Sequence, residues 1–221
     1  MRAVLFDLDD TLISEKEYAK SGYRAVAGKL ASHIGESEEA VCHALWTLFT
    51  EDSRYVFNRF FESRGIAYQE EDIVALIGIY RGHLPVIQFY EDVLETLSEL
   101  RRRGYFLGII SDGYAITQQR KTEALNAQDY FDRIILTDTL GREYWKPSPK
   151  AFDLMAEASG VPLDETVYVG DNPVKDFYIS TIRPVKTARI YREDGVYRER
   201  EYREGVRETY SLHDLRELLS L

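Results

Sequence analysis

The sequence predicts an α/β protein with a doubly wound parallel sheet and a helical domain inserted after the first strand. Three observations predict this fold. A short apolar run opens the sequence, the segment from residue 14 to residue 85 has only helical periodicity, and the remainder alternates between apolar runs and helical patterns. Such alternation is typical of a parallel sheet covered by helices on both faces. We therefore expect a sheet-containing core of residues 1–13 and 86–221 and a helical cap of residues 14–85.

The first expected strand runs from Ala3 to Phe6. An apolar run without helical period is typical of a strand that is buried on both faces of a parallel sheet. It lies in the stretch VLFDLDDTLI, from Val4 to Ile13, which holds three aspartates within four positions. The sequence thus places several like charges at the carboxyl end of a buried strand.

Four helices are expected in the inserted segment. Apolar residues recur there at helical spacing, and Gly35 is a typical C-terminal stop for the first helix. The four apolar stripes consist of Ala19, Tyr23, Val26, Ala27, Leu30 and Ile34; of Val41, Ala44, Leu45 and Leu48; of Val56, Phe57, Phe60 and Phe61; and of Ile73, Leu76, Ile77 and Tyr80.

Helices and strands are expected to alternate after residue 85. The stretch from Tyr191 to Tyr210 repeats Tyr-Arg-Glu three times. It is either a docking surface or a solvated strand or loop, and we expect the latter because charge runs usually face water. Helices are expected at 92–103, 115–126, 149–159 and 174–181, strands at 105–110, 134–136, 166–169 and 186–191, and a short closing helix at 211–221.

The composition excludes several classes of protein. The formal charge of −10, from 38 acidic and 28 basic residues, argues against nucleic-acid binding, which needs clustered Lys and Arg. Cys42 is the only cysteine, so an internal disulfide is excluded, and the four histidines do not pair with it at zinc-site spacing. Neither a targeting segment nor a membrane span is recognisable. We expect a soluble cytoplasmic monomer or homodimer that binds neither nucleic acids nor membranes.

Polar residues follow the expected strands at separate places in the sequence. In a doubly wound sheet, ligands bind beyond the carboxyl ends of the strands, so these residues are expected to converge. Singly, Ser111 could cap a helix, Lys146 could be a solvated lysine and Asp171 could form a turn. Together they indicate a site made of Asp7 to Thr11, Ser111-Asp112-Gly113, Lys146, and Asp171 with Asp176.

The order of these residues resembles the four motifs of the haloacid dehalogenase superfamily of phosphohydrolases. The motifs are Asp-x-Asp-x-Thr at 7–11, Ser111, Lys146, and Gly-Asp-x-x-x-x-Asp at 170–176. The resemblance spans the whole chain and implies a Rossmann-like core. The helical insert is similar to the small α-helical (C1) cap of subfamily I, which includes phosphoglycolate phosphatase, nucleotidases, sugar phosphatases and the 2-haloacid dehalogenases.

The clustered carboxylates also predict a metal ion. Several carboxylates at one strand tip are tolerated only if a cation neutralises them or one of them takes a proton. Hard oxygen ligands favour Mg²⁺. We expect Asp7 and Asp171 to supply side-chain ligands, and the resemblance adds the backbone carbonyl of Asp9.

The resemblance implies roles for the three aspartates after the first strand. Asp7 would attack phosphorus and form an aspartyl-phosphate, which water then hydrolyses. Asp9 points to the same side of an extended segment, and it would protonate the leaving alcohol and then deprotonate the water. We expect the pKa of Asp9 to lie above that of Asp7. Asp10 is expected to be a turn or helix-start residue without a catalytic role.

The remaining motif residues would bind the phosphoryl group. Lys146 would offset the charge on the nucleophile and on the transferring group. Asp176 would orient Lys146 or a metal-bound water, with Asn172 as a second supporting residue. The other phosphoryl-binding groups implied by the resemblance are two hydroxyls and two backbone N–H groups, those of Thr11, Ser111, Asp112 and Gly113.

These expectations describe a Mg²⁺-dependent phosphatase for a small phosphorylated metabolite of the sugar phosphate, nucleotide or phosphoglycolate type. A sugar phosphomutase or another phosphotransferase remains an alternative. A 2-haloacid dehalogenase is disfavoured because Asp9 and Asp171 are both present, and a silent binding or scaffold module would be expected to have lost a site residue. Three cap residues, Arg54, Tyr55 and Asn58, could reach over the pocket, but their spacing fits the outer face of an ordinary helix better.

Overall fold

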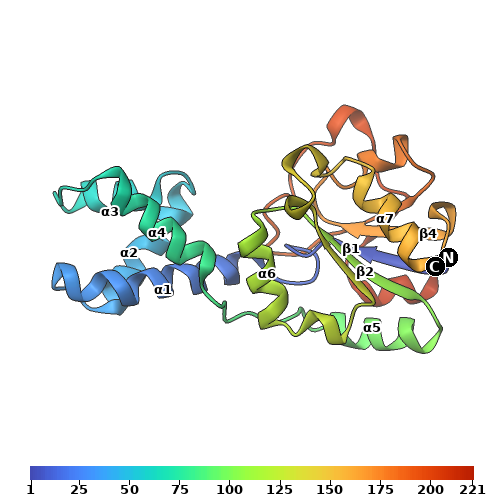
Figure 1. Cartoon of the computed structure of the whole chain (residues 1–221), viewed down its shortest axis with the longest axis horizontal. Helices are drawn as coiled ribbons and strands as arrows, with labels where there is room; N and C mark the ends of the chain where they lie inside the picture. Colours follow the sequence, from blue (N-terminus) through green and yellow to red (C-terminus); the bar gives the residue numbers. More distant parts are fainter. The chain divides into compact units, whose positions relative to one another are not determined.

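The first strand, β1 (Ala3–Phe6), lies in the middle of a six-stranded parallel sheet with the order β3-β2-β1-β4-β5-β6 (Figure 1). The computed structural model describes residues 1–221. The strands from β1 to β3 are added toward one edge of the sheet, and those from β4 to β6 are added toward the other edge. The strand order therefore reverses between β1 and β4. Such a switch point opens a crevice at the carboxyl ends of the strands. The other strands are β2 (Phe106–Ser111), β3 (Arg133–Leu136), β4 (Thr166–Gly170), β5 (Lys186–Ile190) and β6 (Tyr210–Leu212).

The register of the sheet aligns the ends of β1, β2 and β4. Phe6 pairs with Ile109 on one side and with Val169 on the other. The backbone N–H of Asp7 donates to the carbonyl of Val169 at 2.8 Å. The polar residues that follow these three strands therefore lie at one edge of the sheet.

Helices cover both faces of the sheet (Figure 1). Successive residues of a strand point to opposite faces, and β1 follows this rule. Val4 and Phe6 belong to an apolar cluster with Leu97 of α5 (Val93–Arg102), while Leu5 belongs to a second cluster with Phe152 of α7 (Lys150–Ser159). A third helix, α6 (Ala115–Ala124), follows β2. These layers confirm the predicted fold class.

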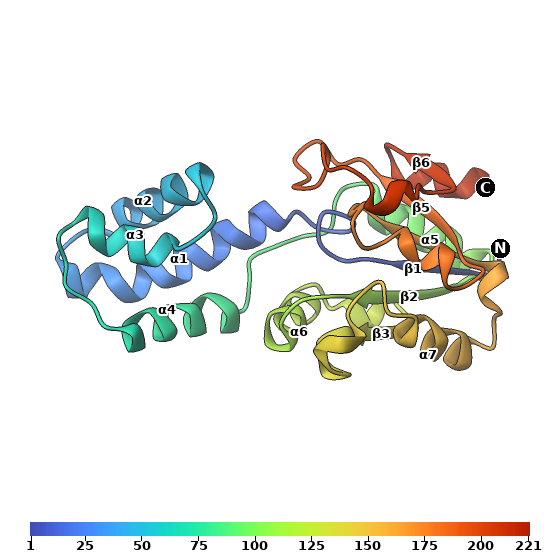
Figure 2. The same ribbon diagram turned by 90° about the horizontal axis from the view of Figure 1, so that it is seen from above.

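The chain divides into two compact units, one formed by Met1–Glu15 and Ile87–Leu221 and the other by Lys16–Val86. The second unit is helical, with α2, α3 and α4 packed around α1 (Figure 2). Gly22 permits one close approach, because a Cβ there would lie 2.5 Å from the ring of Tyr80. The four helices are α1 (Glu15–Ile34), α2 (Glu38–Glu51), α3 (Val56–Ser63) and α4 (Glu70–Gly82).

Two expected helices are wrong in part. Only Tyr178–Thr181 is helical in the segment 174–181, as a 3₁₀ turn, because Asn172 and Asp176 hold the preceding residues in a hydrogen-bonded turn. The closing segment begins with strand β6, which pairs with β5, and only Leu215–Ser220 forms a 3₁₀ helix. None of the helices combines the length and the hydrophobicity that spanning a membrane requires.

Candidate active site

Asp7 and Lys146 form the centre of the polar cluster at the carboxyl end of β1. The Nζ of Lys146 lies 2.8 Å from Asp7 Oδ1 and 2.9 Å from Asp176 Oδ1, and it donates to the hydroxyl of Tyr168 at 2.8 Å. Burial alone would lower the pKa of Lys146, but Asp176 and Asp7 outweigh burial and raise it well above its usual value. Lys146 is therefore a fixed cation beside Asp7.

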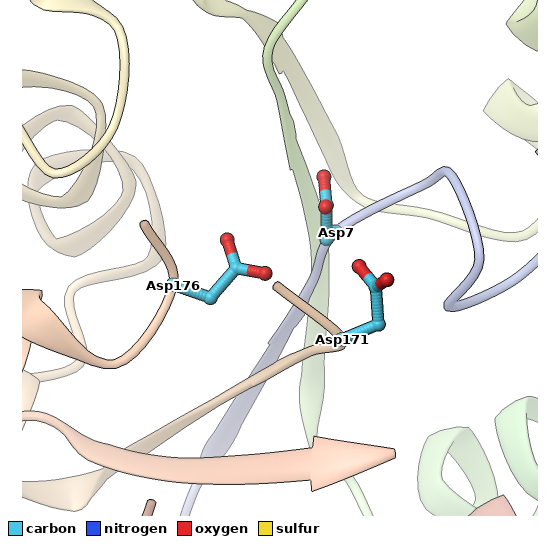
Figure 3. A group of neighbouring side chains, drawn as sticks. All are labelled: Asp7, Asp171 and Asp176. Atoms are coloured by element: carbon cyan, nitrogen blue, oxygen red, sulfur yellow. The ribbon is translucent and has the colours of Figure 1, made fainter. Parts of the chain in front are cut away.

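Three buried carboxylates meet at this point (Figure 3). Asp7, Asp171 and Asp176 each offer an oxygen atom, and these atoms lie within 4.8 Å of one another. Burial raises the pKa of Asp7 to about 7, although Lys146 partly offsets this effect. Burial, together with Asp176 and Asp7, raises the pKa of Asp171 well above its usual value. Fully ionised, the group would carry more negative charge than Lys146 alone neutralises, so it favours either a bound proton or a second cation.

The hydrogen bonds distinguish which of the three carboxylates can accept a cation. Asp176 is fully buried, and both its oxygens are engaged, Oδ1 by Lys146 and Tyr168 and Oδ2 by the backbone N–H of Asn172. Asp171 Oδ2 is buried without a hydrogen-bond partner in the protein. Asp7 and Asp171 are hard oxygen donors of the kind that Mg²⁺ prefers. They fit a bound Mg²⁺ ion, whereas both oxygens of Asp176 are already engaged by protein groups.

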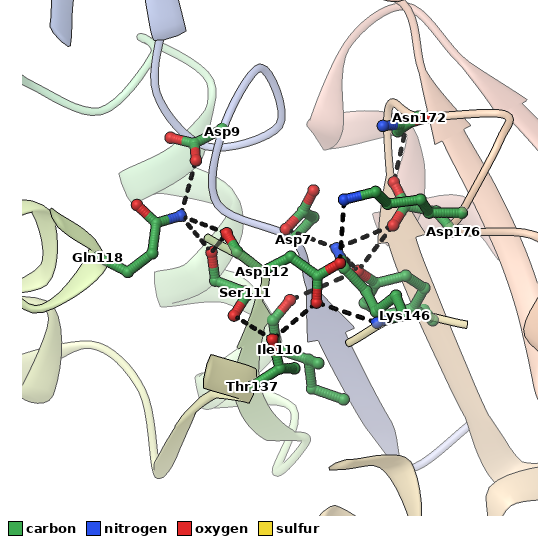
Figure 4. A network of polar contacts seen from close by, with 12 residues as sticks. Asp7, Asp9, Ile110, Ser111, Asp112, Gln118, Thr137, Lys146, Asn172 and Asp176 are labelled. Atoms are coloured by element: carbon green, nitrogen blue, oxygen red, sulfur yellow. Dashed lines mark hydrogen bonds and ion pairs between the residues drawn. The ribbon is translucent and has the colours of Figure 1, made fainter. Parts of the chain in front are cut away.

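Asp9 lies apart from the carboxylate cluster, with its side chain toward α6 (Figure 4). Its Oδ2 accepts a hydrogen bond from Gln118 at 2.7 Å, and its Oδ1 lies 2.6 Å from the Nζ of Lys121. Burial would raise the pKa of Asp9, but Lys121 and Gln118 outweigh burial and lower it. Since the pKa of Asp7 is raised, the order of the two pKa values is the reverse of the order expected from the sequence.

The hydroxyl groups of Thr11 and Ser111, which are expected to bind the phosphoryl group, are both buried. Ser111 ends β2, and its Oγ accepts a hydrogen bond from Gln118 at 2.7 Å (Figure 4). Its own hydrogen has only a long contact of 3.5 Å with the carbonyl of Asp112. Thr11 Oγ1 is buried and has no partner in the protein. Both hydroxyls can therefore donate to an anion.

Asp112 and Gly113 form the turn after β2. The carboxylate of Asp112 points into the protein, where it accepts hydrogen bonds from Thr137 at 2.7 Å and from the backbone N–H of Lys146 at 3.0 Å. Gly113 has a φ of 127° and passes close to Gln118, so a side chain at this position would be strained. The side chain of Asp112 thus joins two motif loops, while its backbone and that of Gly113 form the turn.

Asp10 and Asn172 organise the loops around the site. Asp10 has a φ of 48° and accepts hydrogen bonds from the backbone N–H groups of Glu15 and Val196. It is thus a turn and helix-start residue, as expected. Asn172 accepts a hydrogen bond from the backbone N–H of Val174 and donates its own backbone N–H to Asp176.

Comparison with known proteins places this chain in a family. A sequence model for "haloacid dehalogenase-like hydrolase" matches residues 1–177. The chain belongs to the haloacid dehalogenase-like hydrolase family. This result confirms the resemblance in the order of the four motifs.

Relatives of this hydrolase include named phosphatases. It is 30% identical over 210 residues to a glyceraldehyde 3-phosphate phosphatase of Methanopyrus kandleri, covering 92% of this chain and 88% of the relative. It is 28% identical over 187 residues to the N-acylneuraminate-9-phosphatase of Homo sapiens, covering 77% of this chain and 74% of the relative. A crystal structure of a phosphatase from Thermococcus onnurineus has a TM-score of 0.63 and 28% identity, covering 100% of this chain and 97% of that chain.

Several residues around the candidate site do not follow from the sequence motifs. They are Gln118 and Lys121 on α6, Glu15 at the start of α1, Tyr168 in β4 and Arg192 after β5. The sequence points only weakly to Gln118 and Lys121, through their place in the helix that follows the motif residue Ser111. Tyr168 lies inside an apolar strand, and nothing in the sequence points to it.

The three cap residues considered from the sequence lie in the helical unit of the hydrolase. Arg54 pairs with Asp52 at 2.7 Å. Tyr55 is 76% exposed and has a φ of 54°, and Asn58 donates to the hydroxyl of Tyr68 at 3.2 Å. Two of the three are thus held by neighbours within their own unit.

Proposed function

We propose that this hydrolase is a Mg²⁺-dependent phosphatase that hydrolyses a small phosphate monoester through an aspartyl-phosphate on Asp7. One observation carries the proposal. Asp7 lies beside a fixed cation, Lys146, and close to a carboxylate, Asp171, whose buried Oδ2 has no hydrogen-bond partner in the protein. A cation beside the carboxylate and a metal ion bound next to it would reduce the repulsion between Asp7 and an anionic substrate.

In the first half of the reaction, an oxygen of Asp7 attacks phosphorus and forms a new P–O bond. The bond from phosphorus to the leaving oxygen breaks, and Asp9, protonated in the substrate complex, gives its proton to that oxygen. In the free protein Lys121 and Gln118 lower the pKa of Asp9, so binding of the anionic substrate must raise it. Lys146 holds Asp7 and offsets the negative charge that gathers on the transferring group. The result is a phosphorylated Asp7 and a free alcohol.

In the second half, a water molecule attacks the phosphorus of the aspartyl-phosphate. Asp9, now ionised, takes a proton from the water, and the bond between phosphorus and Asp7 breaks. Phosphate leaves, and Asp7 returns to its starting form. Two moderate steps thus replace one difficult displacement.

The phosphoryl oxygens would be bound by the hydroxyls of Thr11 and Ser111 and by the backbone N–H groups of Asp112 and Gly113. Asp7, Asp171 and the backbone carbonyl of Asp9 would hold Mg²⁺. When bound, the ion would screen the charge between Asp7 and the substrate and polarise a phosphoryl oxygen.

The substrate class that we propose is a small sugar phosphate. The relatives named above are called phosphatases of glyceraldehyde 3-phosphate and of N-acylneuraminate 9-phosphate. We assign the role of cap to the helical unit, which directly follows the aspartate loop in the sequence. The motif residues bind only the phosphoryl group, so the rest of the substrate must be recognised by other residues.

Phosphate release from a panel of esters tests the proposal. The panel contains 4-nitrophenyl phosphate, glyceraldehyde 3-phosphate, N-acylneuraminate 9-phosphate, nucleoside monophosphates and phosphoglycolate. Activity should disappear after exhaustive chelation and return with Mg²⁺. Full activity without metal would contradict the metal assignment, and no activity on any ester by folded protein with Mg²⁺ would contradict the phosphatase itself.

A matched pair of variants tests the metal ligand. Asp171→Asn should raise the Mg²⁺ concentration for half-maximal activity by at least about 10-fold, since even the loss of a residue that only supports a metal ligand typically costs this much. Asp164→Asn changes an exposed aspartate just before β4 and should leave that concentration unchanged. Equal curves for the two variants would remove Asp171 from the site.

A further inference from the structure

Helix α6 buries a polar face. Its buried residues are Gln118, Lys121 and Thr122, and none of them is apolar. By contrast, α5 and α7 bury mostly apolar side chains against the sheet. Residues three and four apart lie on the same face of a helix, so the buried face of α6 presents an amide, an ammonium and a hydroxyl.

Lys121 is only 2% exposed, which is rare for a lysine unless it is paired. Its Nζ donates to Asp9 Oδ1 at 2.6 Å and to Glu15 Oε2 at 2.7 Å. The two carboxylates hold the ammonium from two sides. Lys121 is thus fixed by Glu15 as well as by Asp9.

Gln118 binds the other oxygen of the same carboxylate. Its Nε2 lies 2.7 Å from Asp9 Oδ2, 2.7 Å from Ser111 Oγ and 2.8 Å from the carbonyl oxygen of Asp112 (Figure 4). A carboxylate held at one oxygen can still rotate about its Cβ–Cγ bond. With a separate donor on each oxygen, the plane of the Asp9 carboxylate is fixed.

We propose that Lys121 and Gln118 are positioning residues, which hold the carboxyl group of Asp9 where it exchanges protons with the leaving oxygen and with water. The proposal rests on the proposed function, in which Asp9 is the general acid and base. Gln118 also contacts Ser111, so one amide relates the position of Asp9 to a phosphoryl-binding hydroxyl. Neither residue touches the substrate in this scheme, and both act through Asp9.

The first experiment compares kcat/KM for two esters in Lys121→Met and Gln118→Met. Both substitutions keep an unbranched side chain of good helix propensity. Glycerol 3-phosphate has a leaving group that needs a proton, whereas 4-nitrophenyl phosphate has one that leaves without it. For Lys121→Met we expect a loss of about 10²-fold on the alkyl ester, the usual scale for a misplaced catalytic group, and a clearly smaller loss on the aryl ester.

The second experiment introduces the same substitutions into Asp9→Asn. If Lys121 acts through Asp9, Lys121→Met should cause little further loss in this background. A purely structural role would lower kcat/KM by the same factor in both backgrounds and on both esters, and this result would overturn the proposal. Thermal unfolding of each variant shows whether the protein is folded. Gln118→Met in the Asp9→Asn background tests whether Gln118 also acts through Asp9, and this substitution removes no charge.

A control and a distinguishing outcome complete the design. Arg120→Met removes a cation from the neighbouring position of α6, where Arg120 pairs with Glu123 at 2.7 Å, and it should leave the ratio between the two esters unchanged. Wild-type activity of Asp9→Asn on the alkyl ester would overturn the acid and base role of Asp9, and with it this proposal. If Lys121→Met and Asp9→Asn each cause a large loss of kcat/KM and the losses multiply in the double variant, only the positioning role of Lys121 is overturned.

Discussion

Asp7 and Asp9 are two residues apart, yet different lysines hold their carboxyl groups. Lys146 lies beside Asp7 and is shared with Asp176, whereas Lys121 lies beside Asp9 and is shared with Glu15. Burial dominates at Asp7 and raises its pKa, while the donors on α6 dominate at Asp9 and lower its pKa. In the protein without metal or substrate these shifts run opposite to the proposed roles, which need Asp7 ionised and Asp9 protonated.

Substitution of each aspartate should separate these roles. Asp7→Asn should abolish turnover because it removes the proposed nucleophile, and Asp9→Asn should lower kcat by about 10²-fold or more because it removes the proposed general acid and base. Asp9→Asn should also accumulate phosphorylated enzyme on an aryl ester, since its hydrolysis needs the base. Acid quenching followed by mass spectrometry of the peptide that contains Asp7 measures this species.

The residue that carries the phosphoryl group shows which side chain is the nucleophile. Phosphate bound to Asp7 in Asp9→Asn, and none in Asp7→Asn, is the expected outcome. Phosphate attached elsewhere, or an active Asp7→Asn, would show that the nucleophile is a different group. The exposed Asp129 provides a control, since Asp129→Asn should behave as the wild-type protein.

The sequence identified the residues that directly follow strands. Asp7, Ser111 and Asp171 could be found because charged or hydroxyl side chains after a buried apolar run are unusual. Lys121 and Gln118 could not, because lysine and glutamine are common on the exposed faces of helices. Their burial follows from the polar site opposite α6, which is a tertiary feature. The predicted order of the Asp7 and Asp9 pKa values was wrong because it did not include the buried donors Lys121 and Gln118.

At the scale of elements, the segment after β5 holds the aspartate loop in place. The guanidinium of Arg192 donates twice to the carbonyl of Thr11, at 2.7 and 3.2 Å, and once to Asp92 at 2.7 Å. The backbone N–H of Val196 donates to Asp10. The repeated Tyr-Arg-Glu stretch is therefore not only a solvated loop, because its first arginine is buried and supports the candidate site.

Removal of Arg192 should destabilise the protein. Arg192→Met leaves Asp92 as a buried, uncompensated carboxylate, which typically costs about 3–5 kcal/mol. Thermal or urea unfolding measures the loss. Arg198→Met removes an exposed arginine from the same segment and should change the free energy of unfolding by less than about 0.5 kcal/mol.

A double variant identifies the cause of that loss. Arg192→Met combined with Asp92→Asn should recover part of the stability, because no uncompensated charge stays buried. Equal stability of Arg192→Met and Arg198→Met would show that the buried pair contributes nothing to folding.

The long, periodic elements were predictable, and the short ones were not. All four helices of the helical unit follow from apolar periodicity, and strands β1 to β5 follow from short apolar runs without helical period. Strand β6 has only three residues, too few for an alternating pattern, and it exists because β5 offers an unpaired edge. The segment 174–181 has helical spacing, but the hydrogen bonds of Asn172 and Asp176 compete with helix formation there.

At the scale of the whole molecule, the buried acids predict an unusual dependence of stability on pH. Burial raises the pKa of Asp7 to about 7 and that of Glu15 to about 8. Both values lie above those of the unfolded chain, so the folded protein binds more protons across this range. Stability is then greatest below the unfolded values and falls as the pH rises through the folded ones.

The metal-free protein should therefore lose stability between about pH 5 and pH 8, because Asp7 and Glu15 lose protons there that the folded state binds more tightly than the unfolded chain. The Tm should fall by several degrees. Saturating Mg²⁺ should raise the Tm more at the higher pH, because Asp7 must lose its proton to bind the ion. Scanning calorimetry at both pH values, with and without Mg²⁺, measures the effect.

A Tm of the metal-free protein that rises over this interval would contradict the burial of these acids. Asp7→Asn supplies the control, because it removes one titrating group. Its Tm should depend less on pH than that of the wild-type protein.

The central place of β1 in the sheet also determines the order of events during synthesis. Ala3 pairs with Phe106 and Thr166, so its second partner is made roughly 8–30 s later at about 5–20 residues per second. The helical unit, Lys16–Val86, contains only local segments and can fold during that interval. Until β2 is made, the apolar strand has no partner on the nascent chain, and until β4 is made one of its edges stays unpaired. Strands with unpaired edges associate with one another. Charged residues that flank an apolar segment suppress such association, and we expect the aspartates that directly follow β1 to have this effect on the growing polypeptide.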